Sequence, residues 1–302
     1  RKNTNINSIK SVINIENRNI DIDRKYLNIC SYVSGGIGDN IISIGTLLNI
    51  KKKINCRTKI YIYTERVPEL IKLFEMNEDI KIVDAYFFEN DMQLYDISFF
   101  MAHKLVLKYV NMTEVEKKCP ELIYFIKKIC KENEEYKFYI DSNPLADGIL
   151  AQKEMLMGRN RWTELNVGTF INTPVVPVHL DMNDMDFMKK INVPYITVNF
   201  GSDTTYACIQ PKVWPRENFE AFIALIHETY PSLKVVQVGS ADTPRLKGTD
   251  YAMLGESFSR IKVLLKHSLL HIDSEGGLVH LCRQLKTKCA VLFGPTWQEY
   301  FG

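Results

Sequence analysis

The sequence lacks the features that mark most secreted and membrane-embedded chains. It contains no uninterrupted apolar run of the about 18 residues that a membrane-spanning helix needs, and its first residues do not follow the pattern of a secretory signal. Its seven cysteines are scattered, odd in number and never spaced as Cys-x-x-Cys, which argues against a disulfide framework and against a zinc site. We therefore expect a cytoplasmic protein that carries no metal.

The sequence also has very little net charge. Lys and Arg number 38 and Asp and Glu 36, so the formal charge at pH 7 is +2. Proteins dedicated to nucleic acids carry a clear basic excess, so we expect no nucleic-acid partner. The basic run Lys51–Lys53 falls at the expected end of a helix, where lysines complement the helix dipole. The alternative interpretation of this run is a peripheral contact with the anionic surface of the inner membrane.

What the sequence does contain is a regular alternation of strand-like and helix-like segments. Hydrophobic residues make up 46% of the 302 residues, which is sufficient for a core in each of two domains of about 150 residues. The alternation predicts an α/β protein with two Rossmann-like parallel-sheet domains that face a central cleft. We assign a polar appendage to 1–26, an N-terminal domain to 27–175 and a C-terminal domain to 176–302, with the Pro-rich stretch 173–181 as the linker.

The individual elements follow from periodicity and turn residues. Strands are expected at Leu27–Val33, Lys59–Thr64, Ile80–Tyr86, Asp96–Met101, Tyr136–Ile140, Tyr195–Phe200, Leu233–Val238, Leu269–Asp273 and Cys289–Phe293. Helices are expected at Asn40–Ile54, Pro68–Phe74, Glu114–Lys131, Pro215–Tyr230, Ser257–Lys266 and Gly277–Leu285. The carboxyl ends of parallel strands share one edge of a sheet, so the loops at that edge are the candidates for ligand binding.

The first candidate loop follows the first strand and opens a helix. A dinucleotide-binding loop would read Gly-x-Gly-x-x-Gly, but here Gly36-Ile37-Gly38 is followed by Asp39, and the third glycine is missing. An acid at this turn would repel a pyrophosphate, which disfavours an NAD-dependent dehydrogenase. Two interpretations of Asp39 remain open. It caps the helix, or it is a general base aimed into the cleft.

The second candidate loop follows the first strand of the C-terminal domain. It carries the hydroxyl residues Ser202, Thr204 and Thr205, and Lys212 comes shortly before the next helix. Hydroxyl groups and a lysine beside a helix N-terminus suit a diphosphate. An ordinary surface turn with an unrelated lysine explains the same pattern equally well.

The third candidate loop lies between a strand and a helix near the end of the sequence. Gly276 and Gly277 can bring the N–H groups of the helix start onto a phosphate, whereas Glu275 would reject phosphate and suits sugar hydroxyls. His280 falls in the first turn of the helix, where a histidine is more often a packed or capping residue than a catalyst. No set of residues has metal-ligand spacing, and no Ser or Cys lies in a nucleophile-elbow motif.

Together these loops resemble the signature motifs of the heptosyltransferase family, the ADP-heptose-dependent enzymes of lipopolysaccharide biosynthesis with a GT-B fold. Four motifs in order carry the likeness over about Leu27 to Thr296. Gly36-Ile37-Gly38-Asp39 resembles the family's GxGD, and Lys212-x-Trp214-Pro215 resembles K-x-W-P. Glu275–His280 resembles D-[ST]-G-x-x-H, and Phe293-Gly294-Pro295-Thr296 resembles F-G-P-T. The polar segment 1–26 and the Glu-Gly-Gly variant resemble, more distantly, the branch that glycosylates autotransporter proteins.

The resemblance implies an inverting, metal-independent transferase that uses a nucleotide sugar as substrate and needs no cofactor. Asp39 would deprotonate a hydroxyl of a glycan, lipid-linked or protein acceptor, and Glu275 would bind the hydroxyls of the transferred sugar. The donor's diphosphate would be held by Lys212 with help from Ser202, Thr204, Thr205, Gly276 and Gly277. His280, Gly36 and Gly38 are further candidates for the site.

Two positions depart from the family's pattern. Glu275 stands where the family has Asp, and Gly276 stands where it has Ser or Thr, while Asp273-Ser274 offers a competing register two residues earlier. The longer Glu side chain would reshape the sugar pocket, although heptose remains the favoured sugar. Two other functions fit the same layout: a sugar-nucleotide epimerase, which needs no acceptor, and a non-catalytic GT-B-like binding protein.

Overall fold

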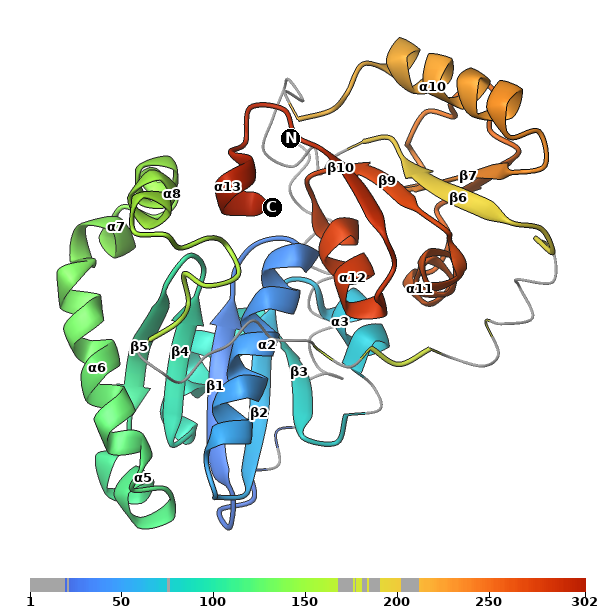
Figure 1. Cartoon of the computed structure of the whole chain (residues 1–302). Coiled ribbons are helices and arrows are strands. Elements are labelled where there is room, and N and C mark those ends of the chain that lie inside the picture. The colour runs from blue at the N-terminus through green and yellow to red at the C-terminus, as the bar shows by residue number, and fades with distance from the viewer. Residues whose placement is uncertain are drawn as a thin grey trace, which may run out of the picture. The chain divides into compact units, whose positions relative to one another are not determined.

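The computed structural model describes residues 20, 22–74, 77–167, 176, 178–180, 184, 191–201 and 212–302. The chain divides into two compact units, each with a five-stranded sheet (Figure 1). Unit 1 comprises Arg1–Gly35, Ile42–Lys153 and Trp162–Pro174, and unit 2 comprises Gly36–Ile41, Glu154–Arg161 and Val175–Gly302. Most of the expected appendage at 1–26 and of the expected linker at 173–181 lies outside the described residues.

The sheet of unit 1 has the strand order β3-β2-β1-β4-β5. Its strands are β1 (Leu27–Val33), β2 (Thr58–Thr64), β3 (Ile80–Asp84), β4 (Ile97–Met101) and β5 (Leu105–Val110). The first four strands run parallel, with β1 between β2 and β4. β5 pairs antiparallel to β4 through a tight connection, so this sheet is mixed rather than parallel as expected.

Helices cover this sheet, and most of them follow from an apolar stripe. They are α2 (Ile37–Lys53), α3 (Val67–Phe74), α4 (Phe88–Asp91), α5 (Met112–Lys118), α6 (Leu122–Glu135), α7 (Lys137–Asp141) and α8 (Asp147–Leu156), with short 3-10 turns at Ala85–Phe87 and Met92–Leu94. α6 buries Leu122, Phe125, Ile126 and Ile129. At the end of α2, Lys51 forms an ion pair with Asp79. No described helix is both long enough and apolar enough to cross a membrane.

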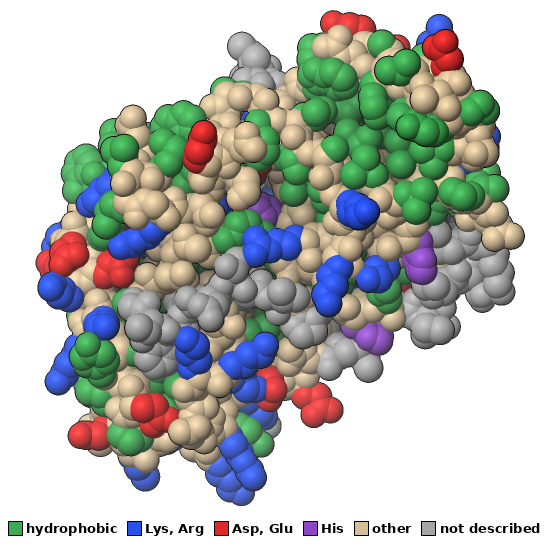
Figure 2. Space-filling view, viewed as in Figure 1, with side chains coloured by type: hydrophobic (Ala, Val, Ile, Leu, Met, Phe, Trp, Pro, Cys, Tyr) green, Lys and Arg blue, Asp and Glu red, His purple; other side chains and the backbone are tan. Residues whose placement is uncertain are grey.

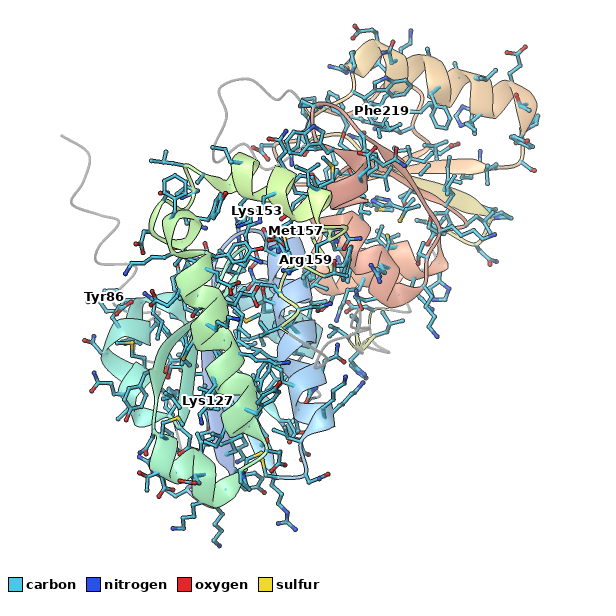
Figure 3. All side chains as sticks on the ribbon, turned by 60° about the vertical axis from the view of Figure 1, so that its left-hand side comes forward. Tyr86, Lys127, Lys153, Met157, Arg159 and Phe219 are labelled. Carbon is cyan, nitrogen blue, oxygen red and sulfur yellow. The ribbon has the colours of Figure 1, made fainter. Side chains whose placement is uncertain are left out.

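The sheet of unit 2 is parallel throughout, in the order β10-β9-β6-β7-β8. Its strands are β6 (Tyr195–Asn199), β7 (Lys234–Gly239), β8 (Tyr251–Leu254), β9 (His271–Ser274) and β10 (Cys289–Leu292), and its helices are α10 (Arg216–Thr229), α11 (Phe258–His267), α12 (Gly277–Leu285) and α13 (Gln298–Phe301). Phe219 of α10 is fully buried against Val198 and Val235 (Figure 3). Leu225 of α10 is exposed. Hydrophobic side chains gather on the upper right of the face drawn in Figure 2.

Two expected elements are wrong. The strand expected at Tyr136–Ile140 is instead helix α7, because the Tyr136 N–H donates to Glu132 O and continues the helical path out of α6. The single helix expected over Glu114–Lys131 is two helices, α5 and α6. Pro120 lies at the break, where its ring removes a backbone donor and resists continuation.

Candidate active site

Asp39 lies in the first turn of α2, within the part of that helix that belongs to unit 2. Its Oδ2 accepts a hydrogen bond of 2.9 Å from the Gly36 N–H, and Asn40 Nδ2 donates to Gly36 O at 2.8 Å. A carboxylate that reaches back to the residue before the helix is half of a capping box. Asp39 therefore does cap the helix, and 37% of its side chain remains exposed.

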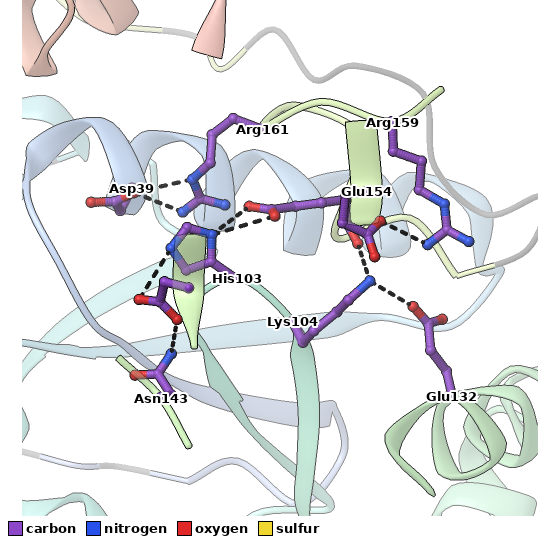
Figure 4. A network of polar contacts seen from close by, with 10 residues as sticks. Asp39, His103, Lys104, Glu132, Asn143, Glu154, Arg159 and Arg161 are labelled. Atoms are coloured by element: carbon purple, nitrogen blue, oxygen red, sulfur yellow. Dashed lines mark hydrogen bonds and ion pairs between the residues drawn. The ribbon is translucent and has the colours of Figure 1, made fainter. Parts of the chain in front are cut away.

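The second partner of Asp39 is Arg161, which the sequence did not single out. Arg161 Nε and Nη2 donate to Asp39 Oδ1 at 3.2 Å and 2.7 Å (Figure 4). Only 3% of the Arg161 side chain is exposed. The two residues are 122 positions apart, and an arginine in a short polar stretch gives neither a periodic nor a motif signal.

Glycines at positions 38 and 277 allow the starts of two helices to lie together in unit 2. A Cβ at position 38 would collide with the His280 ring, and a Cβ at position 277 would lie 3.4 Å from the Gly38 backbone N. Their role in the structure is close packing of α2 against α12. Because a helix N-terminus carries a partial positive charge, this packing also places two such charges side by side.

His280 is buried between these elements. Burial lowers its pKa to about 4, and the nearby guanidinium of Arg161 acts in the same direction, while the Asp39 carboxylate opposes both. The imidazole is therefore neutral at physiological pH. Its Nε2 lies 4.0 Å from Glu275 Oε1. This burial agrees with the simpler interpretation of His280 as a packed residue, at a point where it touches both motif loops.

Lys212 and Glu275 form an ion pair. Lys212 Nζ lies 2.7 Å from Glu275 Oε2, and 5.4 Å from the centre of the Phe301 ring of α13. Glu275 is nearly buried, with 9% of its side chain exposed, whereas the exposed fraction of Lys212 is 38%. The structure thus brings together the residues expected to hold the diphosphate and the sugar.

Two of the remaining expected diphosphate ligands, Gly276 and Gly277, lie among the described residues. Gly276 is the N-cap of α12 and, as a glycine, has no side chain with which to cap the helix. Gly277 is the first residue of the helix. Ser202, Thr204 and Thr205 lie outside the described residues.

Asp273, the acid of the competing register, has a different environment. It is buried in β9, where it accepts a hydrogen bond of 3.0 Å from Asn199 Nδ2 and lies 3.3 Å from His271 Nε2. Burial raises the pKa of its carboxyl. Asp273 therefore ties two strands of the sheet together, and the acid that contacts Lys212 is Glu275.

Unit 1 contains a separate polar network that the sequence also did not indicate (Figure 4). His103 Nδ1 lies 3.3 Å from Glu164 Oε1, and its Nε2 lies 3.5 Å from Asp147 Oδ2. Lys104 Nζ donates to Glu132 Oε1 at 3.2 Å. Within the described ranges, no three His, Cys, Asp or Glu side chains are grouped so that they could hold a metal ion.

Comparison with known proteins gives a fold rather than a family. No family model matches the sequence, and no curated protein does. Among solved structures, the ADP-heptose lipopolysaccharide heptosyltransferase II of E. coli superposes with a TM-score of 0.57 at 11% identity, over 90% of this chain and 86% of that one. A family 9 glycosyl transferase from Veillonella parvula gives a TM-score of 0.57 at 13% identity, over 94% and 85%.

The iron-containing dodecameric glycosyltransferase TibC of enterotoxigenic E. coli gives a TM-score of 0.55 at 11% identity. The match covers 88% of this chain but 60% of that protein. This chain has a GT-B-like fold. The expected α/β fold with two Rossmann-like domains is thereby confirmed, and among the described strands β5 alone pairs antiparallel. At such low identities the likeness establishes the fold alone.

Proposed function

We propose that this protein is an inverting glycosyltransferase that moves a sugar from a nucleotide diphosphate to an acceptor hydroxyl. Heptose from ADP-heptose is the favoured donor, and the acceptor is a glycan, a lipopolysaccharide or a protein. The observation that carries the proposal is the grouping of Asp39, Lys212 and Glu275 around His280 within a GT-B-like fold. We assign acceptor binding to 27–175 and donor binding to 176–302.

In the proposed reaction, the Asp39 carboxylate takes the proton of the acceptor hydroxyl as the acceptor oxygen attacks the anomeric carbon. The bond from that carbon to the diphosphate oxygen breaks, and the nucleoside diphosphate leaves with the electron pair. Attack from the face opposite the leaving group inverts the anomeric configuration. The proton ends on Asp39 and passes to solvent through its exposed side.

Charge on the departing diphosphate is balanced by protein groups in this proposal. Lys212 supplies a full positive charge, and the starts of α2 and α12 supply partial ones. Because Lys212 is paired with Glu275 before the donor arrives, the diphosphate takes the place of that carboxylate. Glu275 then becomes available to the sugar hydroxyls.

The proposal is tested first by donor binding. The full chain is screened by thermal shift against ADP-heptose and against UDP, GDP and CMP sugars, because a ligand that binds only the folded state raises the melting temperature. Lys212→Ala should weaken ADP binding about 10-fold or more by calorimetry. Lys234→Ala is the matched control, since Lys234 has a similar exposure and also pairs with an acid, Asp250, at 2.8 Å.

Transfer is tested next by mass spectrometry of truncated lipopolysaccharide and of protein acceptors incubated with the donor. A mass increase of one sugar, lost in Asp39→Asn, is the expected result. Conversion of the nucleotide sugar without any acceptor would identify an epimerase instead. Tight donor binding without turnover of any acceptor or of the donor itself would identify a binding protein, and either outcome would refute the proposal.

A further inference from the structure

The backbone of Arg161 is held in place by contacts other than its ion pair with Asp39. Its backbone N–H donates to Tyr300 O at 2.7 Å, and the next residue, Trp162, is buried. With 3% of its side chain exposed, the guanidinium has left bulk water. A buried cation is retained only when it is paired and hydrogen-bonded, and here the pairing carboxylate is Asp39.

The geometry of the pair is more specific than simple charge neutralisation. Two guanidinium nitrogens converge on one carboxylate oxygen, Oδ1, while the Gly36 N–H binds the other oxygen, Oδ2. Both oxygens are therefore bonded from fixed groups, so rotation of the carboxylate about its Cβ–Cγ bond is restricted. A planar guanidinium imposes this orientation, which a point charge such as an ammonium cannot do as well.

A neighbouring arginine, Arg159, pairs with a different acid, Glu154, whose side chain is fully buried. Arg159 donates to Glu154 Oε2 at 3.2 Å through Nη1, with 29% of its side chain exposed (Figures 3 and 4). Glu154 is not among the motif residues. Arg159 and Arg161 thus share residue type, chain segment and unit, but differ in which acid they hold.

We propose that Arg161 is the positioning residue of Asp39. It aims the carboxylate, so that the acceptor hydroxyl meets a base in a fixed orientation. This inference rests on the proposed function, because it assigns Arg161 to the same reaction. Arg161 acts through Asp39 and does not itself touch the donor, so its loss should reduce the rate of the chemical step and leave donor affinity intact.

The test compares Arg161→Met, Arg161→Lys and Arg159→Met as full chains. For each, the melting temperature, the calorimetric affinity for ADP, and kcat and KM for release of ADP from ADP-heptose are measured. We expect Arg161→Met to lower kcat about 100-fold with KM for the donor within about 3-fold of the parent, which is the size of effect seen when a catalytic group is misplaced. Arg161→Lys restores the charge without the fork and should recover about 10-fold of the loss. Arg159→Met should remain within about 2-fold of the parent.

Every other result of this experiment would overturn either the positioning role of Arg161 or the proposed function. If the parent releases ADP but Arg161→Met keeps kcat within about 2-fold, or if only KM changes, Arg161 does not position the base. An equal loss of kcat in Arg159→Met would mean that the segment matters only for folding. If Arg161→Met fails to fold, Arg161→Lys decides: unchanged kcat in a folded Lys variant overturns the role. If the parent releases no nucleotide from any donor, the proposed function fails, and the positioning role fails with it.

Discussion

Glu275→Gln should make the protein bind ADP more tightly, although the substitution removes a residue assigned to the active site. In the structure, Glu275 Oε2 forms an ion pair with the Lys212 ammonium, with 2.7 Å between Oε2 and Nζ. A diphosphate that uses the same ammonium has to displace this carboxylate first. Gln has nearly the same shape but no charge, so it competes far less for Lys212.

The size of the effect follows from the exposure of the two partners. Exposed ion pairs contribute about 0.2–1 kcal/mol, and breaking fully buried ones costs about 3–5 kcal/mol. Lys212 is 38% exposed and Glu275 is 9% exposed, so this pair lies nearer the exposed limit, at about 1 kcal/mol. Converted at about 1.4 kcal/mol per factor of ten, ADP should bind roughly 5-fold more tightly to Glu275→Gln.

Calorimetry with ADP and with ADP-heptose separates the two roles assigned to Glu275. The variant should gain affinity for ADP and lose any preference for ADP-heptose over ADP, because the sugar hydroxyls lose a charged acceptor. Glu256→Gln is the control, since Glu256 pairs with Arg260 at 2.8 Å elsewhere in unit 2. ADP affinity that is unchanged or lower in a folded Glu275→Gln would refute competition between this carboxylate and a diphosphate.

Three further predictions concern the start of α2 and the residue His280 packed against it. Asp39→Asn should lower the free energy of unfolding by about 2 kcal/mol in urea titrations, because the buried charge of Arg161 loses the Asp39 carboxylate. The 37% exposure of Asp39 moderates the cost. Gly38→Ala should destabilise the fold by about 1–3 kcal/mol, because the added Cβ collides with His280. Gly148→Ala is the control and should not destabilise the fold, because a Cβ there meets nothing within 4 Å. Similar losses of stability in both variants would contradict the packing argument. The pKa of His280 is about 4 in the folded protein and about 6.5 in the unfolded chain, so the unfolded chain binds more protons between these pH values. The free energy of unfolding should therefore fall by about 3 kcal/mol as the pH drops from about 6.5 to about 4. His280→Gln should remove this pH dependence.

Most of the fold could be predicted from the sequence, because local sequence patterns determine most of its strands and helices. Alternating apolar runs and helical stripes gave the parallel strands except β8 and most of the longer helices except α8, including Gly277–Leu285 with its observed bounds. The failures occur where tertiary context decides. Tyr136–Ile140 has strand-like residues but continues directly from a helix, and β5 has a mixed pattern that becomes a strand only by pairing with β4.

The site was accessible only in part, for a related reason. Asp39, Lys212 and Glu275 stand at the ends of strands or the starts of helices, where sequence patterns point to them. The pairings between these residues and others do not follow from spacing. Arg161 reaches Asp39 across 122 positions, and spacing does not tell that Asp273 is buried in the sheet while Glu275 contacts Lys212.

The two ion pairs of this cluster differ in a way that suits opposite roles. Asp39–Arg161 is held by two hydrogen bonds with the guanidinium 3% exposed, while Lys212–Glu275 has one short contact with the ammonium 38% exposed. Separating the first pair would leave a charge out of water, but Lys212 can exchange its carboxylate for another anion at little cost. With His280 neutral, the two pairs sum to zero charge, so an arriving diphosphate is expected to rearrange the second pair alone. Under the proposed function, the base therefore keeps its arginine partner and its orientation while the donor binds.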